Sequence, residues 1–302
     1  RRSHCRAHLP RTATLAQLVL RKADKIAQMA ADPASQLAPD AVDLPAYCRR
    51  IGYRGELKTN LATLRALHEA HVGSIPFENV DVLLERPILL DTASLQQKLV
   101  TNRRGGYCFE QNCFLKDVLE AIGFPVVGLG ARVRFGTTGI RPRTHMTLLV
   151  EAEGRQYLAD TGFGANGLLE PIPFEAGRIT ELPIISFRLA EERSLWVLQA
   201  TVDGRWSDLY AFTLEPQERI DYVVASHFTA TFPDGIFRKM LTAQLVWREE
   251  RKILRSGEFR VTRPGGEQTR PIRSEAEARA VLAEHFGIDL PAGCALPEGI
   301  FA

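Results

Sequence analysis

The chain has 302 residues, of which 45% are hydrophobic, and a formal net charge of +2. This length allows two or three modest subdomains with their own cores, and the small net charge argues against a surface that binds polyanions. No apolar run approaches the roughly 20 residues that a membrane span requires, so we expect neither nucleic-acid nor membrane partners.

The five cysteines are few, odd in number and scattered: Cys5, Cys48, Cys108, Cys113 and Cys294. This usage is typical of a reducing compartment, and we expect a cytoplasmic location. No C-x-x-C pair occurs, and the spacing of Cys108 and Cys113 does not suit two ligands on one helix, so we expect no structural metal.

Residues 1–40 differ from the rest of the chain. The segment starts with Arg, is basic before Asp24, and ends in an Ala/Pro/Asp-rich stretch, Ala30 to Asp40. We interpret it as a disordered extension or linker, either an upstream addition or a cloning remnant, with an organellar presequence as the alternative. Met29 is a candidate natural start.

Residues 41–125 are predicted to be helical. Asp43 before Pro45 predicts a helix start, and apolar spacing predicts a second helix from Leu61 to His68, opened by Thr59 or Asn60. Pro76 favours an extended stretch from Ile75 to Val80. Asp91 and Ser94 are expected to begin a further helix, Leu95 to Val100. His68 and His71 lie one turn apart, as in a metal pair, but no third ligand is evident.

The stretch from Arg103 to Asn112 contains two arginines and two glycines that lead into Cys108. Behind Cys108, Leu115, Val118, Leu119 and Ile122 have helical spacing, so Cys108 is predicted to open a helix that Gly123 ends. A thiol at a helix N-terminus ionises more readily than a free one, and Gly-Gly permits a sharp turn. The alternative is a buried cysteine that acts as a small hydrophobic residue.

From residue 126 the pattern changes to period 2, which predicts short strands in a barrel or a sandwich. The predicted strands are Val126–Val133, Thr144–Glu151, Arg155–Asp160, Ile184–Leu189, Trp196–Val202 and Asp208–Leu214, with a loop at Phe135–Arg143. The closing part is mixed. Phe237–Trp247 is either helix or strand, Lys252–Thr262 is a hairpin arm that turns at Gly265-Gly266, and Ser274 with Glu277 caps a helix that ends at Gly287.

His145 and Asp160 are predicted to meet across a hairpin. If the two strands from 144 and 155 turn at residues 152–154, His145 lies opposite residues 160 to 162. Cross-strand neighbours have Cβ atoms within about 5–8 Å, so the carboxylate can bind one imidazole nitrogen and leave the other for a thiol. The alternatives are a solvated histidine and an aspartate that only forms a turn.

These residues together resemble the arylamine N-acetyltransferase family over residues 41 to 295. The similar motifs are Arg104-Gly105-Gly106-Tyr107-Cys108-Phe109-Glu110-x-Asn112, His145-Met146-x-Leu148, Asp160-x-Gly162-Phe163-Gly164, Ile75-Pro76-Phe77-Glu78-Asn79 and Tyr47-x-x-Arg50-Ile51-Gly52-Tyr53. The resemblance implies an α+β fold with a helical bundle at 41–125, a central β-barrel at 126–225 and a C-terminal α/β lid at 226–302. It also implies a Cys-His-Asp triad like that of transglutaminases and papain-type proteases.

The implied reaction is ping-pong transfer of an acetyl group from acetyl-CoA through a Cys108 thioester to an arylamine or arylhydrazine, with His145 as base and acid and Asp160 as its orienting group. Phe77 and Phe163 are the implied acceptor-lining residues. Arg141, Arg143 and Thr144 precede His145 and are our candidates for binding coenzyme A. Asp221–Phe237 departs from the family pattern, which leaves the preferred acceptor open, and Thr161 stands where a small aliphatic residue is more usual.

Two other classes of protein are compatible with parts of this pattern. A transglutaminase-like or protease-like cysteine hydrolase would use the same triad on amides, whereas a binding protein with this fold would normally lack one of the three residues. The Pro-Phe-Glu-Asn and Asp-x-Gly-Phe-Gly segments favour the transferase. The acyl donor, the physiological role and the oligomeric state are left open by the sequence.

Overall fold

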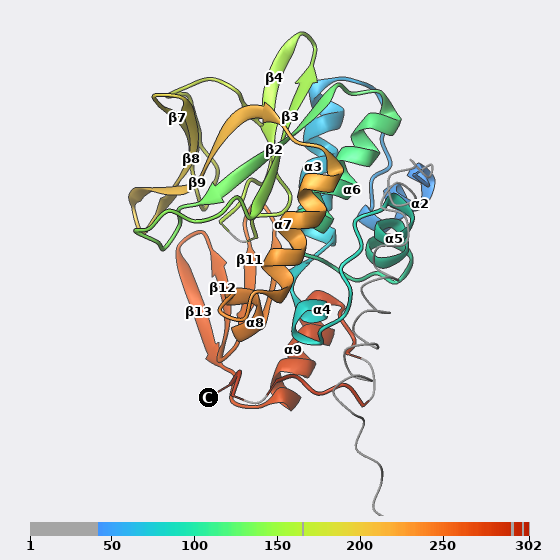
Figure 1. The fold of residues 1–302 in the computed structure, drawn as a ribbon, viewed down its shortest axis with the longest axis vertical. Coiled ribbons are helices and arrows are strands. Elements are labelled where there is room, and N and C mark those ends of the chain that lie inside the picture. The colour runs from blue at the N-terminus through green and yellow to red at the C-terminus, as the bar shows by residue number, and fades with distance from the viewer. Residues whose placement is uncertain (1–41, 165, 291–292, 298, 302) are drawn as a thin grey trace, which may run out of the picture. The chain divides into compact units, whose positions relative to one another are not determined.

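The computed structural model describes residues 42–164, 166–290, 293–297 and 299–301 (Figure 1). The prediction for residues 1–40 lies outside this part of the chain. Residues 39–302 group into one compact unit by their internal contacts. No helix in the described ranges combines the length and apolar character of a membrane span.

The first third of the described chain is helical, as predicted. Its elements are α2 (Leu44–Ile51), α3 (Leu61–Ser74), the short strand β1 (Phe77–Glu78), α4 (Val80–Leu83), α5 (Thr92–Leu95), the π-helix η2 (Gln96–Thr101) and α6 (Cys108–Ile122). Side-chain oxygens of Asp43, Asn60 and Asp91 accept hydrogen bonds from backbone N–H groups three residues later, at 2.8–2.9 Å. These caps satisfy N–H groups that helices leave unpaired at their starts.

Two boundaries in this third differ from the prediction. The helix after Asp91 begins at Thr92, three residues earlier than expected, and continues as a π-helix to Thr101. The extended stretch is shorter than predicted, because Val80 already belongs to α4. In contrast, α6 begins at Cys108 and is followed by Gly123, as expected, and its first eight residues are all buried. It therefore forms the centre of the largest apolar core.

The middle of the chain is an antiparallel eight-stranded sheet in the order β5-β4-β3-β2-β9-β8-β7-β6. The strands are β2 (Val126–Val133), β3 (His145–Ala152), β4 (Arg155–Ala159), β5 (Ile172–Pro173), β6 (Ile179–Thr180), β7 (Phe187–Glu192), β8 (Leu195–Val202) and β9 (Arg205–Pro216). The two edges of the sheet are joined by the short connection between β5 and β6. In this connection, Phe174 N–H donates to the Gln156 carbonyl of β4, and Gly177 N–H donates to the Leu189 carbonyl of β7. The sheet is thus a nearly closed barrel around an apolar interior, which confirms the barrel prediction.

The last part of the chain contains a helix that we did not predict, α7 (Arg219–Thr231), and a second sheet. The sheet has the order β1-β10-β11-β12-β13 and packs on α9. Its elements and the short helix before it are α8 (Ile236–Lys239), β10 (Thr242–Val246), β11 (Arg251–Arg255), β12 (Glu258–Arg263), β13 (Gly266–Pro271) and α9 (Glu275–Phe286). In Figure 1, α7 runs from the barrel toward α8.

Several predictions for this part need correction. Phe237–Trp247 divides into the end of α8 and the strand β10, and Lys252–Thr262 is not one arm, because a turn at Ser256-Gly257 separates β11 from β12. The predicted strand Ile184–Leu189 begins too early, since β7 starts at Phe187. The cap of α9 is as predicted, with Ser274 Oγ accepting from Glu277 N–H at 3.2 Å.

The first and last thirds of the chain share one sheet. Phe77 and Glu78 of β1 pair with Gln244 and Ala243 of β10. The predicted boundary after residue 225 falls inside α7. The first and last parts of the chain therefore pack as one unit.

Candidate active site

The predicted hairpin is formed by β3 and β4. Its turn consists of Glu153 and Gly154, both with positive φ (52° and 72°), and its pairs run from Ala152–Arg155 to Leu148–Ala159. A two-residue turn of this kind matches the twist of the strands. Beyond the last pair, His145 Nε2 and Asp160 Oδ2 lie 2.7 Å apart, and both side chains are almost fully buried. The predicted contact between these two residues is confirmed.

The other carboxylate oxygen connects Asp160 to α6. Asp160 Oδ1 accepts hydrogen bonds from Asn112 Nδ2 and from Gly162 N–H, each at 2.8 Å, while Asn112 Oδ1 accepts from Thr161 N–H at 2.9 Å. Burial alone would raise the pKa of Asp160, but the charge of His145 and these hydrogen bonds outweigh it and lower the pKa. Asp160 is therefore ionised at neutral pH.

Asn112 closes the motif that contains Cys108, but we predicted no role for it. It lies four residues after Cys108, which places both side chains on one face of α6. The motif and this i, i+4 spacing were the available signals.

Cys108 is the first residue of α6 and is 3% exposed. Its thiol donates to the carbonyl oxygen of Thr144 (Sγ···O 3.6 Å), the residue directly before His145. Burial, followed by the negative charge of Asp160, raises the pKa of Cys108, and the backbone groups of Met146 and Phe109 offset only part of this. The prediction that this thiol ionises more readily than a free one is therefore wrong for the isolated thiol, because desolvation exceeds what the backbone groups offset.

The bend after Asp160 packs directly against the start of α6. A Cβ atom added to Gly162 would lie 2.6 Å from Cys108 Cα and 2.8 Å from Asn112 Nδ2. Only glycine allows this approach. This close backbone contact thus places Asp160 near Cys108, and the hydrogen bond between Asp160 and His145 connects the third predicted residue to them.

The loop before Cys108 is held by a buried charge network. Arg104 binds Glu78 Oε1 through two nitrogens (2.7 and 3.1 Å), and Lys98 Nζ lies 2.6 Å from both Asp81 Oδ2 and Glu110 Oε1. Glu110 Oε2 in turn accepts from Tyr107 N–H at 3.1 Å. The carboxylates of three elements therefore fix the backbone that presents the thiol.

The two glycines of this loop have a different purpose from the one predicted. Neither has positive φ, whereas Arg103 does (53°). A Cβ on Gly105 would lie only 2.0 Å from the Pro76 carbonyl oxygen. The reason for glycine at this position is therefore close packing on the segment before β1, and not a sharp turn.

Phe77 and Phe163 pack against different aromatic groups. The Phe163 ring packs against His145 and Tyr210 (centroids 5.3 and 5.4 Å apart), whereas Phe77 packs against Phe237 at 5.9 Å. The cavity that Phe77 and Asp160 line holds only about 10 Å³. Phe237 was not predicted as a site residue, because nothing in its local pattern distinguishes it from a core residue.

A pocket of about 310 Å³ opens onto His145 from the side of α7. Its lining includes Arg143 and Thr144 together with Val224, Ala225 and Phe228. Phe228 and Val224 are partly exposed (41% and 68%), so the walls are apolar and accessible. The pocket therefore offers a path from the surface to the imidazole.

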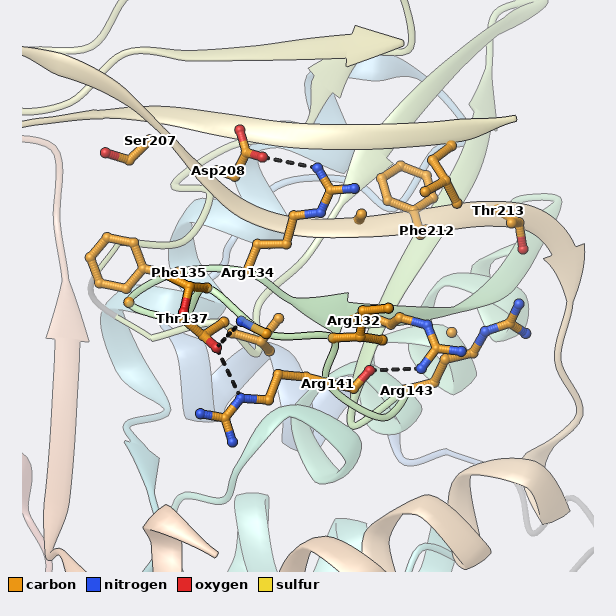
Figure 2. A pocket seen from close by; sticks show the side chains of 18 residues that line it. Arg132, Arg134, Phe135, Thr137, Arg141, Arg143, Ser207, Asp208, Phe212 and Thr213 are labelled. Atoms are coloured by element: carbon orange, nitrogen blue, oxygen red, sulfur yellow. Dashed lines mark hydrogen bonds and ion pairs between the residues drawn. The ribbon is translucent and has the colours of Figure 1, made fainter. Parts of the chain in front are cut away.

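A larger pocket of about 650 Å³ adjoins it and shares Gly130 and Arg143 with it. Figure 2 shows arginines from β2 and the following loop around this pocket. Arg134 pairs with Glu192 and Asp208, and Arg143 with Glu215. Arg132 instead donates to the Arg141 carbonyl oxygen, and Arg141 to Thr137 Oγ1, so these bonds do not neutralise either guanidinium group.

His68 and His71 are both hydrogen-bonded within the protein. His68 Nδ1 lies 3.0 Å from the Leu169 carbonyl oxygen, and His68 Nε2 accepts from Asp160 N–H at 3.1 Å. His71 bonds Tyr47 Oη (2.9 Å) and Gln111 Oε1 (2.7 Å). Within the described ranges, no group of three or more His, Cys, Asp and Glu side chains is arranged to hold a metal ion.

Comparison with known sequences gives a consistent family. The family model for N-acetyltransferase matches residues 60–294. Arylamine N-acetyltransferase of Mycolicibacterium smegmatis is 40% identical over 256 residues, which cover 83% of this chain and 93% of that protein. The Escherichia coli K12 arylamine N-acetyltransferase is 43% identical over 196 residues, which cover 65% of this chain and 70% of that protein.

Solved structures agree. The structure of the M. smegmatis arylamine N-acetyltransferase matches with a TM-score of 0.79 and 40% identity, covering 82% of this chain and 93% of that chain. Mycobacterium marinum arylamine N-acetyltransferase in complex with CoA matches with a TM-score of 0.77 and 34% identity, covering 82% and 93%. The fold and these matches define an N-acetyltransferase. More narrowly, the chain belongs to the arylamine N-acetyltransferase family, as its motifs predicted.

Proposed function

We propose that this chain transfers an acetyl group from acetyl-CoA to an arylamine or arylhydrazine through a thioester on Cys108. The observation that carries the proposal is the buried His145–Asp160 pair, 2.7 Å apart, held against the first turn of α6. Asp160 occupies Nε2 of the imidazole, which leaves Nδ1 for the thiol proton.

In the first half-reaction, the Cys108 proton moves to His145 and the sulfur attacks the acetyl carbonyl carbon. The bond between that carbon and the CoA sulfur breaks, and CoA leaves with the proton from His145. In the second half-reaction, the amine nitrogen attacks the acetyl-Cys108 carbonyl, His145 takes the proton released from nitrogen, and the Cys108 thiol re-forms. No further reactant is needed.

The raised pKa of Cys108 determines how the thiolate forms. A free thiolate in this buried place is unfavourable, so ionisation is coupled to protonation of His145, which Asp160 stabilises. Backbone N–H groups of Phe109 and Met146, which favour negative charge on the sulfur, also suit the oxyanion of the tetrahedral intermediate.

We assign the two adjoining pockets to acetyl-CoA. The arginine-rich pocket suits the phosphate groups, and the apolar pocket that leads to His145 suits the pantetheine arm. Arg143 and Thr144 lie where the second pocket reaches His145, and Arg141 lines the first. A relative was solved in complex with CoA, which supports a CoA donor for this chain.

We assign acceptor binding to Phe77 and Phe163, whose flat rings suit an aromatic amine. The cavity at Phe77 is far smaller than an aromatic ring, and Phe237 packs on that ring. Acceptor binding therefore requires Phe237 to move away from Phe77.

The test is intact-mass measurement after incubation with acetyl-CoA. We expect one added acetyl group on the native protein, none on Cys108→Ala, and discharge of the group by an aromatic hydrazine. Asp160→Asn should remain folded and lose acetylation. An unmodified Cys108 in the native protein, or normal turnover by Asp160→Asn, would refute the proposed mechanism; acetylation followed by release of acetate alone would indicate a hydrolase.

A further inference from the structure

His68 is a fully buried histidine on α3 whose two ring nitrogens have different partners. Nδ1 lies 3.0 Å from the Leu169 carbonyl oxygen, which can only accept, so Nδ1 carries the proton. Nε2 therefore has a lone pair, and it accepts the hydrogen bond from Asp160 N–H at 3.1 Å. The geometry defines one tautomer, with the lone pair directed at the Asp160 main chain.

Through this contact, His68 supplies an acceptor for Asp160 N–H, which has no partner in the β3–β4 ladder. Pairing of β3 with β4 ends at Leu148–Ala159, one residue before Asp160. The carboxylate is held by Asn112 and Gly162, whereas the peptide unit between Ala159 and Asp160 is held separately. Thr147 Oγ1 donates to its carbonyl oxygen at 3.3 Å, and His68 Nε2 accepts from its N–H, so His68 is the side chain that binds the N–H of Asp160.

The contact requires a neutral imidazole. Burial, the largest effect, lowers the pKa of His68, although its hydrogen bond to Leu169 and the charge of Asp160 act in the opposite direction. The ring consequently keeps its lone pair at neutral pH. Glu170, the other charged group that acts on it, does not reverse this balance.

We propose that His68 is a positioning residue: it fixes the Asp160 main chain so that the carboxylate points at His145, and thereby sets how strongly Asp160 stabilises the protonated imidazole. This inference rests on the proposed use of Cys108, His145 and Asp160 in acetyl transfer. His68 and His71 have the spacing of a metal pair, and this inference gives His68 a function other than metal binding.

Two substitutions separate the two hydrogen bonds of His68. In His68→Gln, the side-chain oxygen can take the place of Nε2 and accept from Asp160 N–H, whereas the bond to Leu169 is lost. In His68→Asn, the side-chain amide can take the place of Nδ1 and donate to Leu169, whereas Asp160 N–H loses its acceptor. His71→Gln is the matched control, because His71 is equally buried on the same helix and does not contact Asp160.

The readout is the rate of Cys108 alkylation by iodoacetamide as a function of pH, followed by peptide mass mapping. Weaker stabilisation of the His145 imidazolium raises the apparent pKa of the thiol. We therefore expect His68→Asn to react at least about 10-fold more slowly at neutral pH, with the midpoint shifted upward by about one pH unit. His68→Gln should stay within about 3-fold of the native protein, and His71→Gln should lose thermal stability without a shift of the midpoint.

Equal alkylation rates and midpoints in His68→Asn and His68→Gln would overturn the inference. If His68→Asn does not fold, His68→Ala takes its place, because it also removes the acceptor of Asp160 N–H. Slower alkylation and a raised midpoint in His68→Ala relative to His68→Gln support the inference, and equal values overturn it. Alkylation does not depend on an acyl donor. Parallel incubation with acetyl-CoA therefore distinguishes failure of the acetyl transfer from failure of the positioning role.

Discussion

At the scale of single residues, the site depends on groups whose pKa is set by their surroundings. Cys108 has a raised pKa although it opens a helix, because burial and the charge of Asp160 outweigh the helix terminus. Asp160 has a lowered pKa although it is buried, because His145, Asn112 and Gly162 N–H stabilise its charge. The ease with which Cys108 loses its proton therefore depends on the hydrogen bonds from Asn112 of α6 to Asp160 and from Asp160 to His145.

Gly162→Ala tests the close contact between this chain and α6. The new Cβ would lie 2.6 Å from Cys108 Cα, so α6 or the 160–164 segment must move. Overpacking of this kind costs about 1–3 kcal/mol in unfolding free energy, and a displaced thiol should lower the acetylation rate about 100-fold. Chemical denaturation and stopped-flow acetylation measure the two effects. Native-like values for both would contradict the contact.

At the scale of elements, the loop between β2 and β3 and the unpredicted helix α7 define the approach to His145. The loop supplies Arg141 and Arg143, and α7 supplies Val224 and Phe228. Helix α7 is fixed to α6 by the ion pair between Arg219 and Asp117 and by the contact of Tyr107 Oη with Ser226. Its inner face is therefore held near the thiol, while its outer face stays exposed.

Arg141→Gln tests the assignment of the arginine-rich pocket. Removal of this guanidinium should raise the KM for acetyl-CoA about 5- to 10-fold, because one charge-assisted contact to phosphate is lost. The KM for S-acetyl-N-acetylcysteamine, a short donor without phosphates, should stay unchanged. Arg178→Gln removes one positive charge elsewhere on the barrel, where Arg178 pairs with Glu175, and serves as the control. Equal changes for both donors would contradict the assignment.

At the scale of the whole described unit, buried polar side chains join elements that lie far apart in the chain. Asn79 Nδ2 donates to the carbonyl oxygens of Phe237 and Met240 (2.8 and 2.6 Å), and its Oδ1 accepts from Thr242 N–H at 2.8 Å. His71 links α2 to α6 through Tyr47 and Gln111. Of Asn79 and His71, only His71 titrates, so its two contacts depend on the protonation state of one imidazole.

The pH dependence of stability follows from His71. Burial, and to a lesser degree the charges of His68 and Arg50, lower its pKa from 6.5 to about 3, despite the opposing bond to Gln111. The unfolded chain thus binds the extra proton between about pH 6.5 and 3, so stability is complete above this window and falls as pH decreases through it. The loss from this residue should reach the order of 4 kcal/mol near pH 3.

Denaturant unfolding at pH 7, 5.5 and 4 measures this loss. His71→Gln should be less stable than the native protein at pH 7 and should lose less stability on acidification. The difference between the two profiles isolates His71 from the other titrating groups. Parallel profiles would contradict the lowered pKa.

The sequence by itself determined what local chemistry can encode. Asp43, Asn60 and Ser274 start helices because their side chains cap N–H groups three residues away, and the period-2 pattern with a turn at 153–154 sets the β3–β4 register. That register brings His145 to Asp160 without any long-range information. The family motifs then indicated the arylamine N-acetyltransferase fold.

Tertiary structure decided what depends on residues far apart in the chain. Helix α7 was missed because its apolar residues face solvent as well as the core, and β10 could be assigned only through its pairing with β1 and β11. The raised pKa of Cys108 needs the burial that only packing creates. The lone pair of His68 meets Asp160 only after α3 docks on the end of the barrel, since hydrogen bonds of this kind depend on distances that no local pattern specifies.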